Sequence, residues 1–364
     1  FGNLHFSAEG SLEYTALLYL PKQPPFDQFD PSNRESNVSL YVRRVLIQRE
    51  CTELLPSWLR FVRGVVEYSD LPLNVSRETL QDDPRLGQIR KRLVKKVIDE
   101  LGSLLGKDRE AYSGFWEGFG QVIKEGIWSG DDSDGRIAGV CLFASSNGEA
   151  PTTLEEYVGR MAEGQETIHV LTGADRITVE ASPLLDAVLA RGEEVIYLID
   201  PVDEWMLQRL TEFDGKKIIP LDRADSTEDD DAREKREELQ KEHEGLLGAL
   251  KGPLEEDIEE VRFTSRLKDS PAVLVAAEGG ISGHMERMLK RSGQEVPPQK
   301  RVLELNPDHD LVKSLTKLYG VDQKSPRIAE AAEVLHGQAL LAEGGNLGCT
   351  QLGRIEAARA GVRI

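Results

Sequence analysis

The sequence has few of the residues that cross-link small secreted domains or hold metal ions. Its three cysteines, Cys51, Cys141 and Cys349, are far apart and odd in number. This usage is typical of a reducing compartment and gives neither a disulfide framework nor the spacing of a metal site. The six histidines are also scattered, so we expect no bound metal.

Long apolar runs are also missing. None approaches the ~20 residues that a membrane-spanning helix needs, and no secretory signal is visible at the start. Hydrophobic residues make up 39% and charged residues 30% of the chain, a balance typical of a soluble globular protein. Because the chain begins at Phe1 without a methionine, we expect a fragment or a processed product.

Positive charge is scarce. The net charge of −19 argues against nucleic acid as the main partner, because phosphate binding needs a cationic surface. One helical segment is locally basic, and we interpret its cations as a solvated face: Arg85, Arg90, Lys91, Arg92, Lys95 and Lys96.

At 364 residues the chain is too long for one ordinary core. In the first predicted region, 1–149, apolar and polar residues alternate over 11–21 and 37–47, which predicts strands. A short helix is predicted over 55–66, with Val65 among its inward residues. Asp83-Pro84 then starts a long amphipathic helix, and a second one runs from Tyr112 to Trp128.

Residues 150–223 alternate helices with short apolar strands, which predicts a small α/β unit with parallel pairing. The predicted helices include 182–191 and 203–213. A strongly charged stretch, 224–247, reads as a linker or solvated helix. For the last region, 248–364, the sequence pattern predicts strands and helices in mixed order. The predicted fold class is therefore α/β and α+β, in several domains.

Residues 70–81, DLPLNVSRETLQ, have the composition of a rigid loop. Pro72 restricts the backbone, and Asn74 and Ser76 favour turns. Arg77 and Gln81 follow as a permanent cation and an amide donor. Taken alone, this pattern favours a loop whose arginine pairs with a neighbouring carboxylate.

The exact sequence of the loop is more specific than its composition. The run FVRGVVEYSDLPLNVSRETLQ closely resembles the middle domain of the heat-shock protein 90 chaperones. PVDEWMLQRLTEFDGKK, ELNPDHDLVKSL and ALLAEGG resemble the same family in the same order. The missing acidic tail peptide favours the bacterial or organellar type. The last segment, NLGCTQLGRIEAARAGVRI, departs from the family's final helix.

This resemblance implies middle-domain αβα units, a charged linker and a mixed α+β C-terminal dimerisation domain. It also implies that Arg77 contacts the γ-phosphate of ATP, with Gln81 close by. The nucleotide and magnesium would be held by an N-terminal ATP-binding domain of the same protein, so we expect no cofactor on this chain alone. The resemblance also implies a homodimeric chaperone of the bacterial cytoplasm. An organellar location is less favoured, and no membrane partner is expected.

Unfolded or partly folded client proteins are the implied partners. Two apolar faces stand out: Trp205, Met206 and Leu210 on one helix, and Ile281, Met285, Met288 and Leu289 on another. Methionine surfaces adapt to varied partners. The resemblance places client contacts at Trp205, Met206 and the second face, while the alternative is that both faces pack inside their domains.

Two other functions are compatible with the residues. One is an ATP-independent dimeric scaffold. The other is a stand-alone α/β enzyme acting through Cys141 or His169, although neither residue has an identifiable base or oxyanion loop nearby in sequence.

Overall fold

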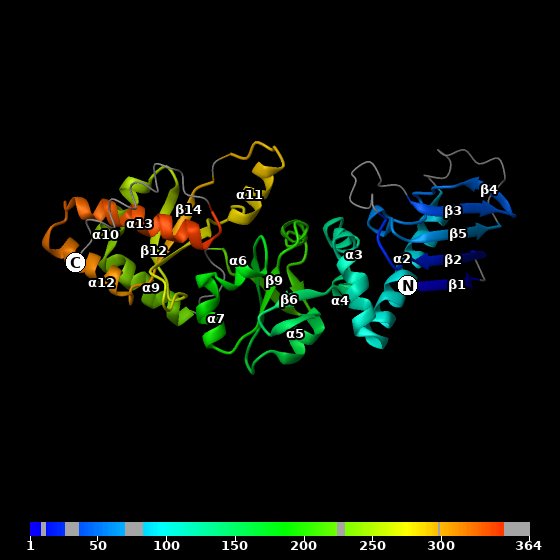
Figure 1. Cartoon of the computed structure of the whole chain (residues 1–364), viewed down its shortest axis with the longest axis horizontal. Coiled ribbons are helices and arrows are strands. Elements are labelled where there is room, and N and C mark those ends of the chain that lie inside the picture. Colours follow the sequence, from blue (N-terminus) through cyan, green and yellow to red (C-terminus); the bar gives the residue numbers. More distant parts are fainter. Residues whose placement is uncertain (9–11, 26–35, 70–82, 224–229, 298, 346–364) are drawn as a thin grey trace. The chain divides into compact units, whose positions relative to one another are not determined.

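The computed structural model describes residues 1–8, 12–25, 36–69, 83–223, 230–297 and 299–345 (Figure 1). Arg77 and Gln81 therefore lie outside the described residues, as does the departing segment after 345. The chain forms two compact units. The first unit comprises 1–142, 153–155 and 205–210, and the second unit comprises 143–152, 156–204 and the chain from 211 onward. No described helix is long and apolar enough to cross a membrane.

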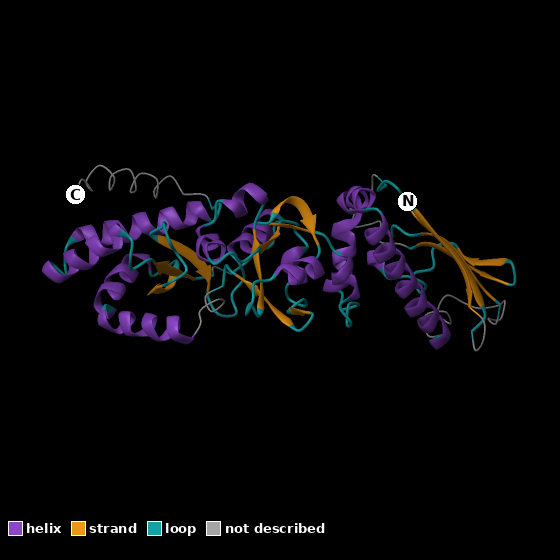
Figure 2. Ribbon diagram, turned by 90° about the horizontal axis from the view of Figure 1, so that it is seen from below, coloured by secondary structure: helices purple, strands orange, loops and turns teal. Residues whose placement is uncertain are grey.

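The first unit contains a five-stranded sheet in the order β1-β2-β5-β3-β4. Its strands are β1 (Gly2–Ala8), β2 (Tyr14–Leu20), β3 (Asn37–Val42), β4 (Val45–Gln48) and β5 (Arg63–Tyr68). Helices lie along one face of this sheet (Figure 2). Alternate side chains such as Leu18, Leu40 and Val66 are buried. Neighbours with the opposite phase are open, and Tyr19 is 47% exposed.

Two long helices cover the buried face of that sheet. Asp83 caps α2 (Pro84–Lys107) by accepting from the Arg85 amide, and α3 (Arg109–Trp128) follows directly. Both predicted helices and the predicted cap are confirmed. A short helix, α4 (Arg136–Val140), completes this side of the unit. The apolar stripes are buried as the periodicity predicted, at Leu86, Ile89, Leu93, Val97 and Leu101 on α2 and Phe115, Phe119, Val122, Ile123 and Ile127 on α3.

One prediction in the first unit is wrong, and a second, the strand over 37–47, is confirmed but interrupted by a turn. Residues 55–66 form a 3₁₀ turn, η1 (Ser57–Leu59), followed by β5, so Val65 lies on a strand and is 38% exposed. Val65 and Val66 favour extended backbone there and Gly64 disfavours a helix, against the helical period that the prediction used. Residues 37–47 form a hairpin that turns at Arg43 and Arg44, whose φ angles are 47° and 68°.

The second unit contains a six-stranded sheet in the order β10-β11-β8-β9-β6-β7. Its strands are β6 (Phe143–Ser145), β7 (Gly148–Thr152), β8 (Thr167–Thr172), β9 (Val195–Leu198), β10 (Glu212–Phe213) and β11 (Lys216–Pro220). The pairs β11–β8 and β8–β9 are parallel, as predicted, while β6, β7 and β10 add antiparallel edges. β6 and β7 were not predicted from the sequence.

Short helices connect these strands: α5 (Leu154–Arg160), α6 (Arg176–Glu180), η2 (Pro183–Leu185), α7 (Asp186–Ala190) and α8 (Asp203–Met206). Two predicted helices were too long. The helix expected over 182–191 is divided into η2 and α7, and the one over 203–213 stops at Met206 before β10. Such boundaries depend on tertiary contacts that override local periodicity.

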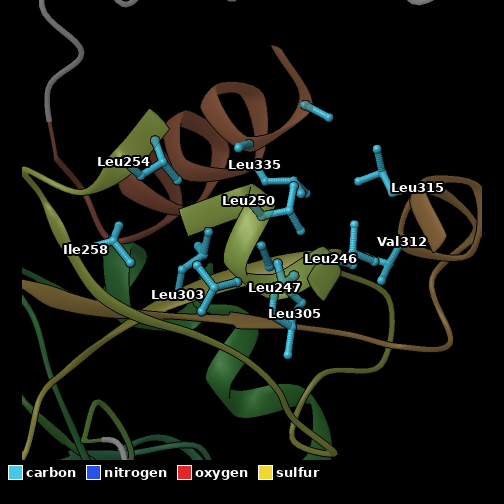
Figure 3. Close-up of a cluster of buried hydrophobic side chains, with 14 of the residues drawn as sticks. Leu246, Leu247, Leu250, Leu254, Ile258, Leu303, Leu305, Val312, Leu315 and Leu335 are labelled. Atoms are coloured by element: carbon cyan, nitrogen blue, oxygen red, sulfur yellow. The ribbon is translucent and has the colours of Figure 1, made fainter. Parts of the chain in front are cut away.

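A three-stranded sheet in the order β12-β14-β13 follows in the second unit. Its strands are β12 (Ile258–Phe263), β13 (Ala272–Ala276) and β14 (Arg301–Leu305). The helices of this part of the chain are α9 (Asp230–Glu242), α10 (Glu244–Lys251), η3 (Gly252–Leu254), α11 (Gly283–Arg291), α12 (Asp310–Val321) and α13 (Pro326–Ala342). Leu250, Leu303 and Leu335 meet in a core between this sheet and its helices (Figure 3). The mixture of parallel and antiparallel sheets with helices confirms the predicted α/β and α+β class. The predicted domain boundaries stay predictions.

A buried ion cluster joins the two sheets of the second unit. Glu304, 1% exposed, binds Arg262 at 2.7 Å and Arg266 at 2.6 Å. Arg266 also donates to the carbonyl oxygens of Leu221 and Arg223, just beyond β11. A second apolar core, which includes Leu171, Tyr197, Val273 and Val302, contains residues of both sheets.

Packing against Trp58 in the first unit can be tested on one helix. A Cβ atom at Gly126 would lie 2.7 Å from Cδ2 of Trp58 and 3.0 Å from Cδ1 of Ile137, whereas one at Gly114 would meet nothing within 4 Å. We expect Gly126→Ala to lower the free energy of unfolding by about 1–3 kcal/mol. The matched control Gly114→Ala should raise it by about 0.5–1 kcal/mol. Urea unfolding measures both, and equal effects would contradict this packing.

Candidate functional site

The site is built around α11, a short amphipathic helix between two loops (Figure 1). Ser282 caps it, because its hydroxyl oxygen accepts from the Met285 amide at 3.0 Å. The same hydroxyl donates to the Glu204 carboxylate at the start of α8. One serine therefore fixes the helix start and ties it to a segment that lies 78 residues earlier in the chain.

A second carboxyl group lies near that contact. Burial and the negative charge of Asp222 together raise the pKa of Glu204 to about 7, although hydrogen bonds from Ser282 and Thr172 lower it. Burial also raises the pKa of Asp222, whose carboxylate accepts from the Thr172 hydroxyl at 2.9 Å. The start of α11 thus rests on a carboxyl group that carries a proton more readily than an ordinary glutamate does.

Ion pairs hold the body of α11. Arg301, on β14, binds Glu286 of α11 and Glu343, the residue after α13, each at 2.7 Å. Arg287 of α11 also donates to the Glu343 carbonyl oxygen at 2.7 Å. The side chain of Arg301 is 11% exposed, so these pairs are screened less than surface pairs. We call Glu286, Arg287, Arg301 and Glu343 the α11 clamp.

The α11 clamp needs a residue without a side chain at Gly283. A Cβ atom at this position would overlap the Glu343 carboxylate and would lie 2.5 Å from Nη1 of Arg301. Any side chain at the first residue of α11 therefore displaces the ion pair.

The apolar face of α11 is divided between buried and accessible residues. Met285 is 4% exposed, so it offers no surface in this conformation. Ile281, Met288 and Leu289 are half-buried. The helix ends before Gly293, which has φ of 77°, a conformation that suits glycine and stops the helix.

The other predicted face lies in the first unit and is also mostly buried. Met206 is 1% and Leu210 is 7% exposed. These two residues therefore pack inside the unit, which was the alternative to a client-binding face. Trp205 is half-buried, and its ring centroid lies 5.5 Å from that of Trp128. Only the indole of Trp205 offers surface here.

The predicted catalytic residues, Arg77 and Gln81, lie outside the described residues, but both flanks of their segment are described. Tyr68 ends β5 and is fully buried. The guanidinium carbon of Arg85 lies 5.9 Å from the centre of the Tyr68 ring, and Arg85 binds the capping Asp83 at 2.7 Å. The two flanks of residues 70–82 therefore meet in one contact.

The residues considered for a stand-alone enzyme have structural surroundings. Cys141 is fully buried, and its thiol donates to the Ile137 carbonyl oxygen at 3.2 Å. His169 lies on β8 with its Nε2 atom 2.9 Å from Glu193, and burial lowers its pKa. Among the described residues, no hydroxyl or thiol group forms a hydrogen bond with the His169 ring.

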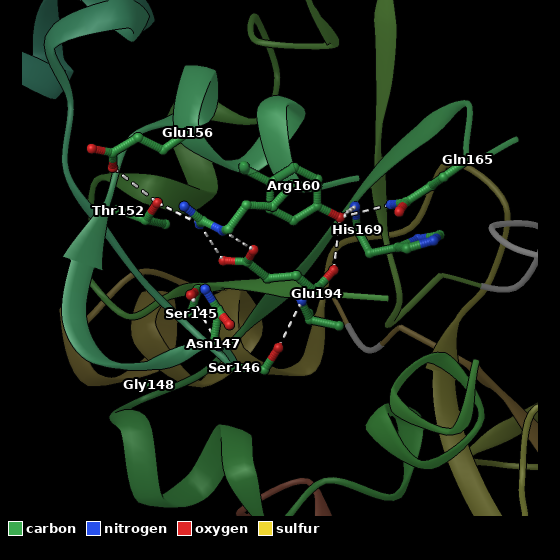
Figure 4. Close-up of polar contacts among 12 residues, drawn as sticks. Ser145, Ser146, Asn147, Gly148, Thr152, Glu156, Arg160, Gln165, His169 and Glu194 are labelled. Atoms are coloured by element: carbon green, nitrogen blue, oxygen red, sulfur yellow. Dashed lines mark hydrogen bonds and ion pairs between the residues drawn. The ribbon is translucent and has the colours of Figure 1, made fainter. Parts of the chain in front are cut away.

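The polar network around His169 supports the strands (Figure 4). The Tyr157 hydroxyl donates to the Glu194 carbonyl oxygen at 2.7 Å and accepts from the His169 amide at 3.0 Å. Arg160 binds the Glu194 carboxylate at 2.9 Å and donates to Thr152 at 2.7 Å. These bonds join α5 to β7, to β8 and to the residue that precedes β9.

Comparison with known proteins identifies the family. The sequence model of the family described as Hsp90 protein matches residues 1–351. The chain belongs to the Hsp90 family. The chaperone protein HtpG of Geobacter sulfurreducens is 46% identical to it over 348 residues, which are 94% of this chain and 53% of that protein. HtpG of Mycobacterium avium is 44% identical over 344 residues, 93% of this chain and 53% of that protein.

The chain thus spans about half the length of the Hsp90 relatives that it matches. The family resemblance read from the loop and from three later segments is confirmed. Sequence reasoning had missed the clamp around α11. Glu286 and Arg287 stand on the helix itself, but nothing in the sequence pairs them with Arg301 or Glu343.

The Glu204 carboxyl predicts a pH dependence of stability. Its pKa in the folded protein, about 7, lies above the ordinary value of 4.5. This difference stabilises the folded protein by on the order of 3 kcal/mol at low pH. The stabilisation is fully present below pH 4.5 and is lost as the pH rises through 7. Glu204→Gln should remove this part of the pH dependence, which urea unfolding from pH 4.5 to 8 measures. Identical pH profiles for the two proteins would contradict the assignment.

Proposed function

We propose that this chain is part of a bacterial Hsp90-type chaperone, in which α11 binds unfolded or partly folded client proteins. The observation that carries the proposal is a capped amphipathic helix whose half-exposed apolar residues are held at the surface by the α11 clamp. Family membership supports the chaperone class, because the relatives are named as chaperone proteins.

In this proposal Ile281, Met288 and Leu289 make the first contact with a client, and Met285 becomes available only when α11 moves. Methionine side chains are flexible and polarisable, so they adapt to varied apolar segments. Trp205 offers a second contact through its half-buried indole, and the next residue, Met206, is buried.

The second part of the proposal concerns ATP. Arg77 acts on the γ-phosphate in the transition state and Gln81 assists, while an N-terminal ATP-binding domain of the same protein holds ATP and magnesium. A guanidinium group stabilises charge that spreads over phosphate oxygens. The contact between Tyr68 and Arg85 supports this role, because it fixes both flanks of the segment that carries Arg77.

The protein would work as a homodimer in the bacterial cytoplasm, joined through residues 248–364. No nucleic acid or membrane takes part in this proposal. An ATP-independent scaffold remains the competing function, and the Arg77 experiment below separates the two.

The client contact predicts a selective effect of Met288→Ser in the full-length protein. We expect the Kd for a fluorescently labelled unfolded client to rise about fivefold, since roughly 1 kcal/mol of apolar contact is lost. Val321→Ser is the control, because Val321 is 89% exposed at the end of α12, away from α11 in sequence. Fluorescence anisotropy measures both, and an equal change in the two variants would reject α11 as the client site.

The ATP role predicts a change in turnover without a change in affinity. In the full-length protein, Arg77→Ala should lower kcat at least about tenfold and leave the Kd for ATP almost unchanged. Arg77→Lys should not restore turnover, because an ammonium group lacks the planar fork of donors. Gln81→Ala should cost less, since it removes a neutral partner.

The control for that experiment is Arg233→Ala, which removes an exposed arginine on α9 that forms an ion pair with Glu237 one turn later. Its steady-state turnover should equal that of the unchanged protein. Normal turnover in Arg77→Ala would contradict the catalytic role and favour the scaffold.

A further inference from the structure

A pair of tryptophans lies at the surface of the first unit, where α3 ends. Trp128 is the last residue of this helix and is 39% exposed. Trp205 is half-buried, and the two ring planes meet at 47° with their centroids 5.5 Å apart. Indole rings gain much when they leave water, so the accessible part of this pair is a favourable place for a partner to bind.

A third tryptophan shows what such a ring can hold. Trp116 lies on the same helix, and the Nζ atom of Lys124 is 5.9 Å from the centre of its ring. This is the distance at which a cation is attracted by the electron-rich face of an indole. In the part of the chain that the structure describes, no lysine or arginine lies over Trp128 or Trp205. The two rings can therefore accept a cation from a partner.

The charge beside Trp128 is negative. The loop that follows it, 129–135, contains three aspartates and no lysine or arginine. Asp131 is exposed and accepts hydrogen bonds from two uncharged groups, the Trp58 indole at 2.7 Å and the Ser129 hydroxyl at 3.1 Å. The C-terminal end of a long helix adds a partial negative charge at the same place. A cation at the ring of Trp128 is thus attracted by three separate groups.

The neighbouring arginines do not fill this place. Arg136 forms ion pairs with Asp99 at 3.4 Å and with Asp134 at 3.5 Å. Arg209, four residues after Trp205, is exposed and lies over neither ring of the pair. The aromatic surface and the charge of Asp131 are therefore both accessible to a side chain from another molecule.

We propose that Trp128 and Trp205 bind the arginine and lysine side chains of unfolded client segments, with Asp131 as a nearby counter-charge. The inference rests on the proposed client binding and names the kind of side chain that this second contact selects. Arginine is favoured over lysine, because its planar guanidinium group can stack on an indole while its hydrogens remain free to meet a carboxylate.

Two labelled peptides test the proposal on the full-length protein. One consists of three repeats of Gly-Ser-Leu-Arg, and the other has glutamine in place of each arginine. Fluorescence anisotropy should show tighter binding of the arginine peptide. Trp128→Leu keeps an apolar side chain but removes the ring, so the Kd for the arginine peptide should rise about fivefold while that for the glutamine peptide stays the same.

Two further variants sharpen the test. Asp131→Asn removes the charge but keeps an oxygen that can accept from Trp58, and it should reduce the preference for arginine. Tyr19→Leu is the matched control, because Tyr19 is 47% exposed in the same unit and pairs in register with Arg63 rather than with an acidic residue. It should leave both Kd values unchanged.

The outcomes separate this inference from client binding by α11. If Met288→Ser weakens both peptides while Trp128→Leu changes both equally or neither, the cation preference of the pair is wrong and client binding stands. A preference for arginine that persists in Trp128→Leu would arise from the net charge of −19 and would also overturn the inference. Binding of neither peptide would overturn both proposals.

Discussion

The second unit depends on the burial of Glu304 between two guanidinium groups. Glu304 stands on the central strand of a three-stranded sheet, opposite Arg262 on the neighbouring strand. Arg266 reaches from the same carboxylate to the carbonyl oxygens at the end of β11. Removing one partner from such a buried cluster leaves a charge without compensation, which typically costs about 3–5 kcal/mol. The two sheets are therefore held in one arrangement by charge as well as by their shared apolar core.

The site around α11 uses the same strand. Arg301 begins β14, and Glu304 lies three residues further along it. The clamp on α11 and the cluster that joins the sheets are therefore connected through rigid backbone, so a shift of β14 would reach both. This connection gives a physical route by which rearrangement of the sheets would release α11.

α11 itself combines features that favour both docking and release. Its apolar face is only partly buried, and its attachment relies on one shared serine hydroxyl and a few ion pairs. Contacts of this kind are directional and can be broken one at a time, whereas a large apolar interface separates only as a whole. The burial of Met285 also keeps one apolar side chain of the helix away from water.

The sequence by itself determined the long helices, the parallel core of the α/β sheet and the family. Those features depend on periods of two and 3.6 residues or on contiguous motifs, which are local. Tertiary structure decided where Val65 points, where the helix after Asp203 ends, and which residues hold α11. Arg301 pairs with Glu343 across 42 residues, and the bond between Ser282 and Glu204 spans 78. No local pattern encodes such pairs, because they exist only once the sheets have packed and the charges have been removed from water.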